Sequence, residues 1–170
     1  MTRHNVRARD TAIVYAGVLP YAFKKTRNGQ KLLVLLGKEP SGWSDFGGGR
    51  EQGETPRRTA AREANEESLM LLGSIGQIMK AVREAEAIRT DRAVHYLHEI
   101  SYDDDLPRLF KTLRVRLSRS PEASKFPMYL EKTSIQWFPL DRLKEEITLR
   151  PHRFRAHFVA DMTPNIVHTQ

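Results

Sequence analysis

The stretch that decides how this 170-residue chain is interpreted is GGREQGETPRRTAAREANEESLM, residues 48–70. Pro56 follows a threonine, and this pair is typical of a helix start, because threonine caps the first turn and proline fits the first helical position. A helix from there places Glu63, Glu66 and Glu67 on one face, since they are three and four residues apart. Their charges repel one another, and a divalent cation that prefers hard oxygen ligands removes this repulsion. We therefore expect a metal site on this helix.

This segment resembles the Nudix box, the signature of the Nudix hydrolases. The family pattern is glycine, five residues, glutamate, seven residues, then arginine, glutamate, an apolar residue, any residue, two glutamates, any residue, glycine and an apolar residue. The matching positions are Gly48, Glu54, Arg62, Glu63, Ala64, Glu66, Glu67 and Met70. One position departs from the pattern, because Leu69 stands where the family has glycine.

The departure at Leu69 concerns the end of the helix. A leucine disfavours a left-handed backbone conformation at a helix exit by roughly 1 kcal/mol or more. We therefore expect the helix to run on through residues 69–72 and to end near Gly73. No charged position of the box is affected, so we expect a changed exit geometry rather than a loss of chemistry.

The resemblance implies a fold and a reaction. The expected fold is α+β, a Nudix-type α/β/α sandwich with a mixed β-sheet, as a single domain over residues 1–170. The expected reaction is the hydrolysis of a phosphorus-containing acid anhydride, with Mg²⁺ or Mn²⁺ as cofactor and a nucleoside diphosphate derivative as substrate. Two alternatives with the same chemistry are removal of the mRNA 5′ cap and hydrolysis of diphosphoinositol polyphosphates. A third alternative is a catalytically lapsed Nudix-fold module that binds RNA or nucleotide, although the retained glutamates argue against it.

The resemblance also implies roles for individual residues. Arg62 would orient a glutamate, and Glu54 would pair with Arg62 or hold the loop. The general base differs between subfamilies and is left open. The implied catalytic residues are Glu54, Arg62, Glu63, Glu66 and Glu67. The implied metal ligands are the carbonyl of Gly48 with Glu63, Glu66, Glu67 and Glu131.

Glu131 is included because the segment LEKTSIQWFPLDRL resembles the late Nudix segment in which an acidic residue precedes a strand with tryptophan. Glu99 and the aspartates at 103–105 are its competitors for this role. His95 and His98 fall on opposite faces of an expected strand, so we interpret them as surface or packing residues.

The charge of the chain bears on the substrate. The net charge is +7 and the isoelectric point is near 9.9, which favours polyanionic partners such as nucleotides, RNA or inositol phosphates. The same charge can equally serve solubility on a solvated helix face. The candidate phosphate-binding residues are Lys38, Arg50, Arg108 and Lys111. The aromatic residues available to stack on bases are Phe110, Phe126 and Tyr129.

Composition indicates a soluble, cytoplasmic protein. The chain has no cysteine, which fits a reducing compartment, and no apolar run long enough to cross a membrane. Residues 1–10 are polar and contain no apolar segment of a secretory signal. No membrane partner is expected, and the oligomeric state stays open.

Outside the box, the sequence predicts mixed strands and helices, with a hairpin rather than a regular βαβ alternation. Strands are expected at 11–19, 31–37, 43–46, 92–102 and 134–138, with a hairpin turn at Asn28-Gly29 and a glycine loop at 47–49. Helices are expected at 140–146 and 153–162. Residues 106–119 fit either a basic helix or an extended segment.

Overall fold

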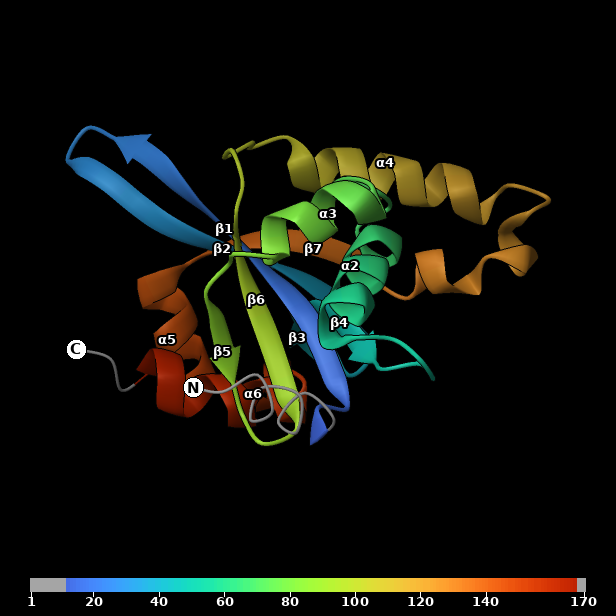
Figure 1. Cartoon of the computed structure of the whole chain (residues 1–170). Helices are drawn as coiled ribbons and strands as arrows, with labels where there is room; N and C mark the ends of the chain where they lie inside the picture. The colour runs from blue at the N-terminus through green and yellow to red at the C-terminus, as the bar shows by residue number, and fades with distance from the viewer. Residues whose placement is uncertain (1–11, 168–170) are drawn as a thin grey trace.

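The structure, a computed structural model, describes residues 12–167 and has a mixed β-sheet between helices (Figure 1). The strands are β1 (Tyr15–Thr26), β2 (Gly29–Glu39), β3 (Gly42–Ser44), β4 (Phe46–Gly49), β5 (Ala87–Arg89), β6 (Ala93–Glu99) and β7 (Ser134–Pro139). The helices are α2 (Pro56–Glu67), α3 (Ile75–Val82), α4 (Leu106–Ser118), α5 (Leu140–Leu149) and α6 (Ala156–Met162). The short turns are η1 (Ala123–Lys125), η2 (Pro127–Leu130) and η3 (Pro151–Arg153), which are 3₁₀-helical, and η4 (Thr163–Val167), which is π-helical.

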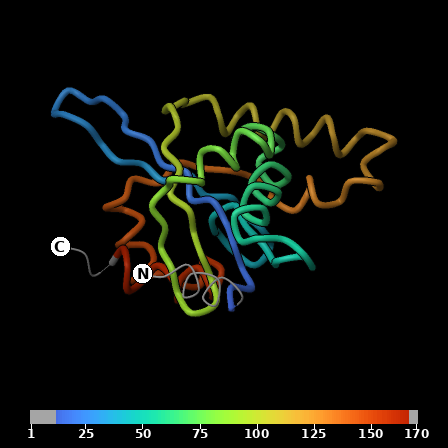
Figure 2. Tube along the Cα trace, viewed as in Figure 1, coloured from blue at the N-terminus to red at the C-terminus, as the bar shows by residue number. Residues whose placement is uncertain are grey.

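The sheet order is β3-β2-β1-β6-β5, with β4 added to β1 and β7 added to β2. Strands β1 and β6 are parallel, and the other pairs are antiparallel. This confirms the expected α+β class with a mixed sheet. The tube trace in Figure 2 shows the long β1–β2 hairpin projecting beyond the rest of the sheet.

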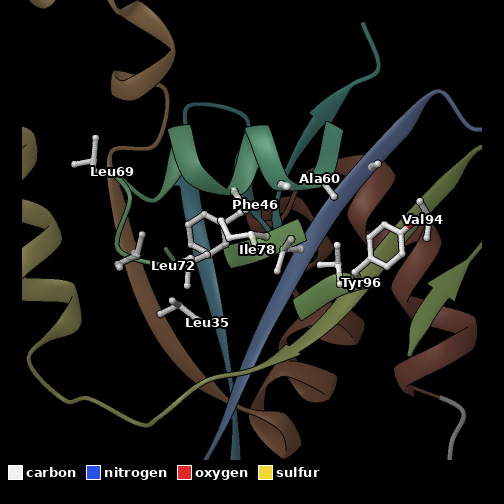
Figure 3. Close-up of a cluster of buried hydrophobic side chains, with 14 of the residues drawn as sticks. Leu35, Phe46, Ala60, Leu69, Leu72, Ile78, Val94 and Tyr96 are labelled. Carbon is white, nitrogen blue, oxygen red and sulfur yellow. The ribbon is translucent and has the colours of Figure 1, made fainter. Parts of the chain in front are cut away.

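Helices cover both faces of the sheet, and each face has its own apolar core. On one face, the buried alanines Ala60, Ala61 and Ala64 let α2 lie close to the strands, and Phe110 of α4 and Ile78 of α3 complete the packing (Figure 3). The other face is covered by α5 and α6, with core residues such as Leu143, Phe158 and Met162. The layered order confirms the expected sandwich.

Several boundaries differ from the sequence prediction. The prediction of a glycine loop at 47–49 is wrong, because Gly47, Gly48 and Gly49 lie in β4 and pair with β1. The hairpin turn is shifted by one residue, since Thr26 pairs with Gly29 across Arg27 and Asn28. The last helix, α6, begins at Ala156, after the turn η3. Of residues 106–119, Leu106–Ser118 form the helix α4, and both α3 and β5 were missed. The polar segment 1–10 and the first residue of the predicted strand 11–19 lie outside the described residues.

The exit of α2 contradicts the expected extension to Gly73. The helix ends at Glu67, and both Leu69 (φ 56°) and Met70 (φ 64°) have left-handed backbone conformations. Such conformations cost an L-residue roughly 1–2 kcal/mol each. Burial of Leu69, which is 8% exposed, and a hydrogen bond from Met70 N to Asn65 O (2.8 Å) hold the turn against this cost. Tertiary packing therefore overrides the local preference of leucine.

Within residues 12–167, no helix is both long and apolar enough to cross a membrane.

Candidate active site

Strand β4 and helix α2 bring the two ends of the sequence motif together. Gly48 lies so close to Glu63 that a Cβ atom on residue 48 would collide with the Glu63 carboxylate. A side chain at this position would therefore force the Glu63 carboxylate to move. Next to it, Gly49 has open space around the corresponding point. The glycine of the motif is thus required by the close approach of a carboxylate and not by an unusual backbone angle.

Arg62 is the centre of a charged cluster on α2. Its guanidinium donates to both carboxylate oxygens of Glu54, at 3.0 and 3.1 Å, which is a bidentate pair. It also donates to Glu63 at 2.8 Å, to Glu66 at 3.3 Å, and to the carbonyl of Gly49 at 3.2 Å. One arginine therefore fixes three glutamates and the end of β4.

Glu54 also closes the loop that precedes α2. Its carboxylate accepts from the backbone N–H of Glu51 at 3.2 Å and from the Thr59 hydroxyl at 2.8 Å. The hydrogen bonds from Arg62, aided by these two, lower the pKa of Glu54 to about 2. Both roles implied for Glu54, pairing with Arg62 and holding the loop, are present in the geometry.

Glu67 is buried and is held by two groups. Its carboxylate accepts from the backbone N–H of Gly47 at 2.8 Å and lies 3.3 Å from Nζ of Lys132. Lys132 is fully buried and also contacts Glu39 at 2.6 Å. Its stem passes over Gly37, where an added Cβ would lie 2.8 Å from the lysine Cδ, so glycine makes room for it.

These groups line one cleft with a volume of about 420 Å³. Its acidic wall comes from α2, and Glu131 and Met128 border it from the segment after α4. Arg155 also lines the cleft, and its guanidinium donates to Glu39 at 2.9 Å. The lining residues are Glu39, Gly47, Gly48, Gly49, Glu51, Arg62, Glu63, Glu66, Glu67, Met128, Glu131 and Arg155.

Burial shifts the acidity of the glutamates on α2. It raises the pKa of Glu63 and of Glu66 above the usual range, although Arg62 opposes the shift. Burial raises the pKa of Glu67 further, against the nearby ammonium of Lys132. The protein environment therefore disfavours the charged form of these glutamates, and a bound cation would stabilise that charged form.

The donor chemistry of this cleft fits a hard divalent cation. Glu63, Glu66, Glu67 and Glu131 supply carboxylate oxygens, and Gly48 adds a backbone carbonyl on the same cleft. Across residues 12–167, no three acidic or histidine side chains already converge as a formed metal site. Here Arg62 and Lys132 contact the glutamates instead. Metal binding therefore requires these carboxylates to reorient.

The four candidate phosphate-binding residues are not brought to the cleft. Lys38 is exposed, with its ammonium 5.8 Å from the Trp43 ring centroid, and Arg50 donates to the carbonyl of Ile13. Arg108 and Lys111 are exposed on α4, where Arg108 pairs with Asp105. Arg155 lies on the cleft in addition to Arg62, and sequence reasoning missed it because nothing near it in sequence marks it.

The competitors of Glu131 also lie outside the cleft. Glu99 is exposed and accepts a hydrogen bond from Tyr21, and Asp103 accepts one from the backbone of Asp105 at the start of α4. Of the aromatic candidates, Phe110 is fully buried and cannot stack on a ligand, whereas Phe126 is 45% exposed.

His95 is neither a surface residue nor a simple packing residue. It is fully buried, and its ring nitrogens lie 2.7 Å from Asp45 and 3.0 Å from Asp161. Burial alone lowers the pKa of His95, but the two carboxylates outweigh it and raise the pKa to about 9. Tyr15 donates to the other oxygen of Asp45 at 2.7 Å. This network joins β6 and α6 to the residue that precedes β4.

Comparison with known proteins agrees with this geometry. The family model of the NUDIX domain matches residues 16–158. No curated protein sequence matches the chain. Among solved structures, a Nudix hydrolase from M. smegmatis, RenU, has a TM-score of 0.50 at 14% identity, covering 90% of this chain and 83% of that one.

Two other solved structures are similar in fold. An Ap4A hydrolase from C. elegans in a binary complex has a TM-score of 0.47 at 16% identity, covering 89% of this chain and 96% of that one. The T. brucei MERS1–RNA complex has a TM-score of 0.46 at 12% identity, covering 96% of this chain and 66% of that one. The domain match extends over most of the chain and includes the whole motif at 48–70. The chain therefore belongs to the NUDIX domain family, as a Nudix hydrolase that acts on pyrophosphate bonds.

Proposed function

We propose that this protein is a Mg²⁺- or Mn²⁺-dependent pyrophosphohydrolase that cleaves the diphosphate linkage of a nucleoside diphosphate derivative, with its site on one domain formed by the whole chain. The observation that carries the proposal is the single cleft in which Glu63, Glu66, Glu67 and Glu131 meet Gly48. A protein that only binds polyanions gains nothing from this concentration of negative charge.

The cation would be held by the carboxylates of Glu63, Glu66 and Glu67 with the carbonyl of Gly48, and Glu131 would add a ligand from the opposite side. When bound, it supplies charge neutralisation for the diphosphate and lowers the pKa of a bound water. The carboxylates are the candidate acceptors for the proton of the attacking water, and Glu131 is favoured because it is the exposed one among the four proposed carboxylate ligands.

Arg62 and Arg155 have different parts in this proposal. Arg62 positions Glu63 and Glu66 through one rigid guanidinium, while Glu54 holds Arg62 in place. Arg155 lies on the cleft, so its guanidinium is available to contact a phosphate oxygen of the substrate. The same guanidinium pairs with Glu39.

The test is hydrolysis of a substrate panel with Mg²⁺ or Mn²⁺ added. The panel contains deoxynucleoside triphosphates, ADP-ribose, NADH, a dinucleoside polyphosphate, a diphosphoinositol polyphosphate and cap-labelled RNA. We expect metal-dependent cleavage of at least one nucleotide compound, reduced at least about a hundredfold in Glu66→Gln because the charge of a metal-holding carboxylate is lost.

Glu145→Gln is the matched control, since Glu145 is an exposed glutamate on α5 that pairs with Arg142 outside the cleft. It should retain full activity. Hydrolysis confined to capped RNA or to the inositol compound would replace the proposed substrate class with that one. Tight binding of RNA or nucleotide without cleavage of any compound would contradict the enzyme proposal and support a lapsed site.

A further inference from the structure

The described residues also form a second, apolar pocket with a volume of about 360 Å³. Its walls come from the turn after α2, from one side of α4 and from the segment that includes η2. The lining residues are Leu69, Met70, Leu113, Leu117, Phe126 and Tyr129. Each of these side chains is aliphatic, aromatic or a thioether, in contrast to the charged cleft.

The wall from the turn after α2 is built from strained backbone. Leu69 and Met70 have the positive φ angles that L-residues rarely adopt, and both side chains line the pocket. Met70 is 61% exposed, so it gains little from burial in the core. Strain at Met70, which burial in the core does little to offset, is a sign of a functional role. A glycine at either position would relieve the strain but would leave the wall open.

The pocket and the cleft share the same two structural elements. On the α2 side, Glu66 and Glu67 line the cleft, and Leu69 and Met70 line the pocket immediately after them. On the η2 side, Met128 lines the cleft while Tyr129 lines the pocket. A molecule with a charged part in the cleft can therefore place an adjoining apolar part in the pocket.

The aromatic residues indicate which kind of group fits. Phe126 and Tyr129 form an edge-to-face pair with ring centroids 6.2 Å apart, and Phe126 is 45% exposed. A flat aromatic ring is suited to pack on such side chains and against a flexible methionine. Among the parts of a nucleoside diphosphate derivative, the nucleobase is the flat and least charged one.

We propose that this pocket binds the nucleobase of the substrate whose diphosphate lies in the cleft. The assignment rests on the proposed pyrophosphohydrolase function for its substrate, but the binding of a nucleoside to the pocket is a separate property. Leu69 and Met70 then select for a base-containing compound, and the departure of Leu69 from the family pattern gives the pocket one of its walls.

The experiment uses the whole chain, free of metal, with ¹³C-labelled methionine methyl groups. The chain has five methionines, so the spectrum is simple. Adenosine, guanosine and uridine are titrated in turn, with ribose 5-phosphate as the compound without a base. We expect at least one nucleoside to shift the Met70 methyl signal, whereas Met162, buried in the core on the other face, stays unmoved. Ribose 5-phosphate should leave Met70 unmoved.

Phe126→Ala should weaken the affinity for that nucleoside at least about fivefold, because stacking on an aromatic side chain is lost. Phe23→Ala is the matched control, since Phe23 is 43% exposed on the projecting hairpin and lies outside the pocket. It should leave the affinity unchanged.

Three results would overturn the assignment: no nucleoside shifting Met70, equal effects of the two phenylalanine variants, or a Met70 shift that depends on protein concentration alone. The last result would indicate that a second copy covers the pocket. Nucleoside binding at Met70 without hydrolysis of any diphosphate compound would contradict the proposed function but would support the nucleobase pocket. Hydrolysis without nucleoside binding would reject only the pocket.

Discussion

The ammonium of Lys132 lies 3.3 Å from the carboxylate of Glu67, and both side chains are buried at the inner end of the cleft. The same ammonium contacts Glu39 at 2.6 Å and donates to the Ser44 hydroxyl and the Asp45 carbonyl, each at 3.0 Å. A cation of the chain itself therefore balances two carboxylates beside the proposed metal site.

Removing this internal cation should destabilise the fold. We expect Lys132→Met to lower the free energy of unfolding by about 3–5 kcal/mol, because the buried Glu67 would be left without its counter-charge. The loss should be smaller at pH 5.5 than at pH 8, because the raised pKa of Glu67 favours protonation of this carboxylate at the lower pH. Urea unfolding at the two pH values measures both effects.

The matched control is Lys125→Met, because Lys125 is exposed and pairs only with the neighbouring Glu122 among the ion pairs of the described region. Its effect should stay within about 0.5 kcal/mol. Equal losses in the two variants would show that the buried pair has no special importance.

The close approach of Gly48 to Glu63 predicts that alanine at position 48 impairs metal binding and turnover more than alanine at position 49. Gly48→Ala should displace the Glu63 carboxylate, weaken Mn²⁺ binding and lower kcat at least about tenfold. Gly49→Ala should change both quantities little, because an added Cβ there meets nothing within 4 Å. Calorimetric titration with Mn²⁺ separates the loss of metal affinity from the loss of turnover. Similar behaviour of the two variants would contradict this reading of the contact.

The left-handed backbone at Met70 predicts that glycine is better tolerated than alanine. Met70→Gly and Met70→Ala both remove the side chain, but only glycine relieves the positive φ angle. We expect Met70→Gly to be more stable than Met70→Ala by about 1 kcal/mol. Chemical denaturation of the two variants gives the difference directly, and an equal or reversed order would mean that the turn is not strained at this residue.

The buried side chain of His95 predicts that the stability of the fold depends on pH. The pKa of this side chain is about 9 in the folded protein, above the ordinary value of 6.5, so folding favours the protonated form. The stabilisation is fully present below pH 6.5 and is lost as pH rises through 9, on the order of 3 kcal/mol in total. Unfolding free energies measured at intervals from pH 6 to 9.5 should show this decline. His95→Gln should flatten the curve over the same range, and a slope that persists in this variant would assign the dependence to other groups.

Several features followed from the sequence because their causes are local. Thr55 accepts a hydrogen bond from the N–H of Arg58 and starts α2 at Pro56, as the capping pattern predicts. A single loop and helix set the spacing of Glu63, Glu66 and Glu67 and the pairing of Arg62 with Glu54. These features can therefore be predicted from a short stretch of sequence.

The contacts that complete the cleft could not be predicted from the sequence. Lys132 and Glu39 are 93 residues apart, and Arg155 and Glu39 are 116 apart, so only strand pairing and helix packing bring them together. At Leu69, the local preference pointed to a longer helix, but burial in the core and the bond from Met70 to Asn65 decided for a left-handed turn. The helix and its glutamates could be predicted from the sequence, because hydrogen bonds and spacing within one turn suffice. The internal cation, the arginine on the cleft and the apolar pocket could not, because they depend on long-range packing free energy that no local pattern encodes.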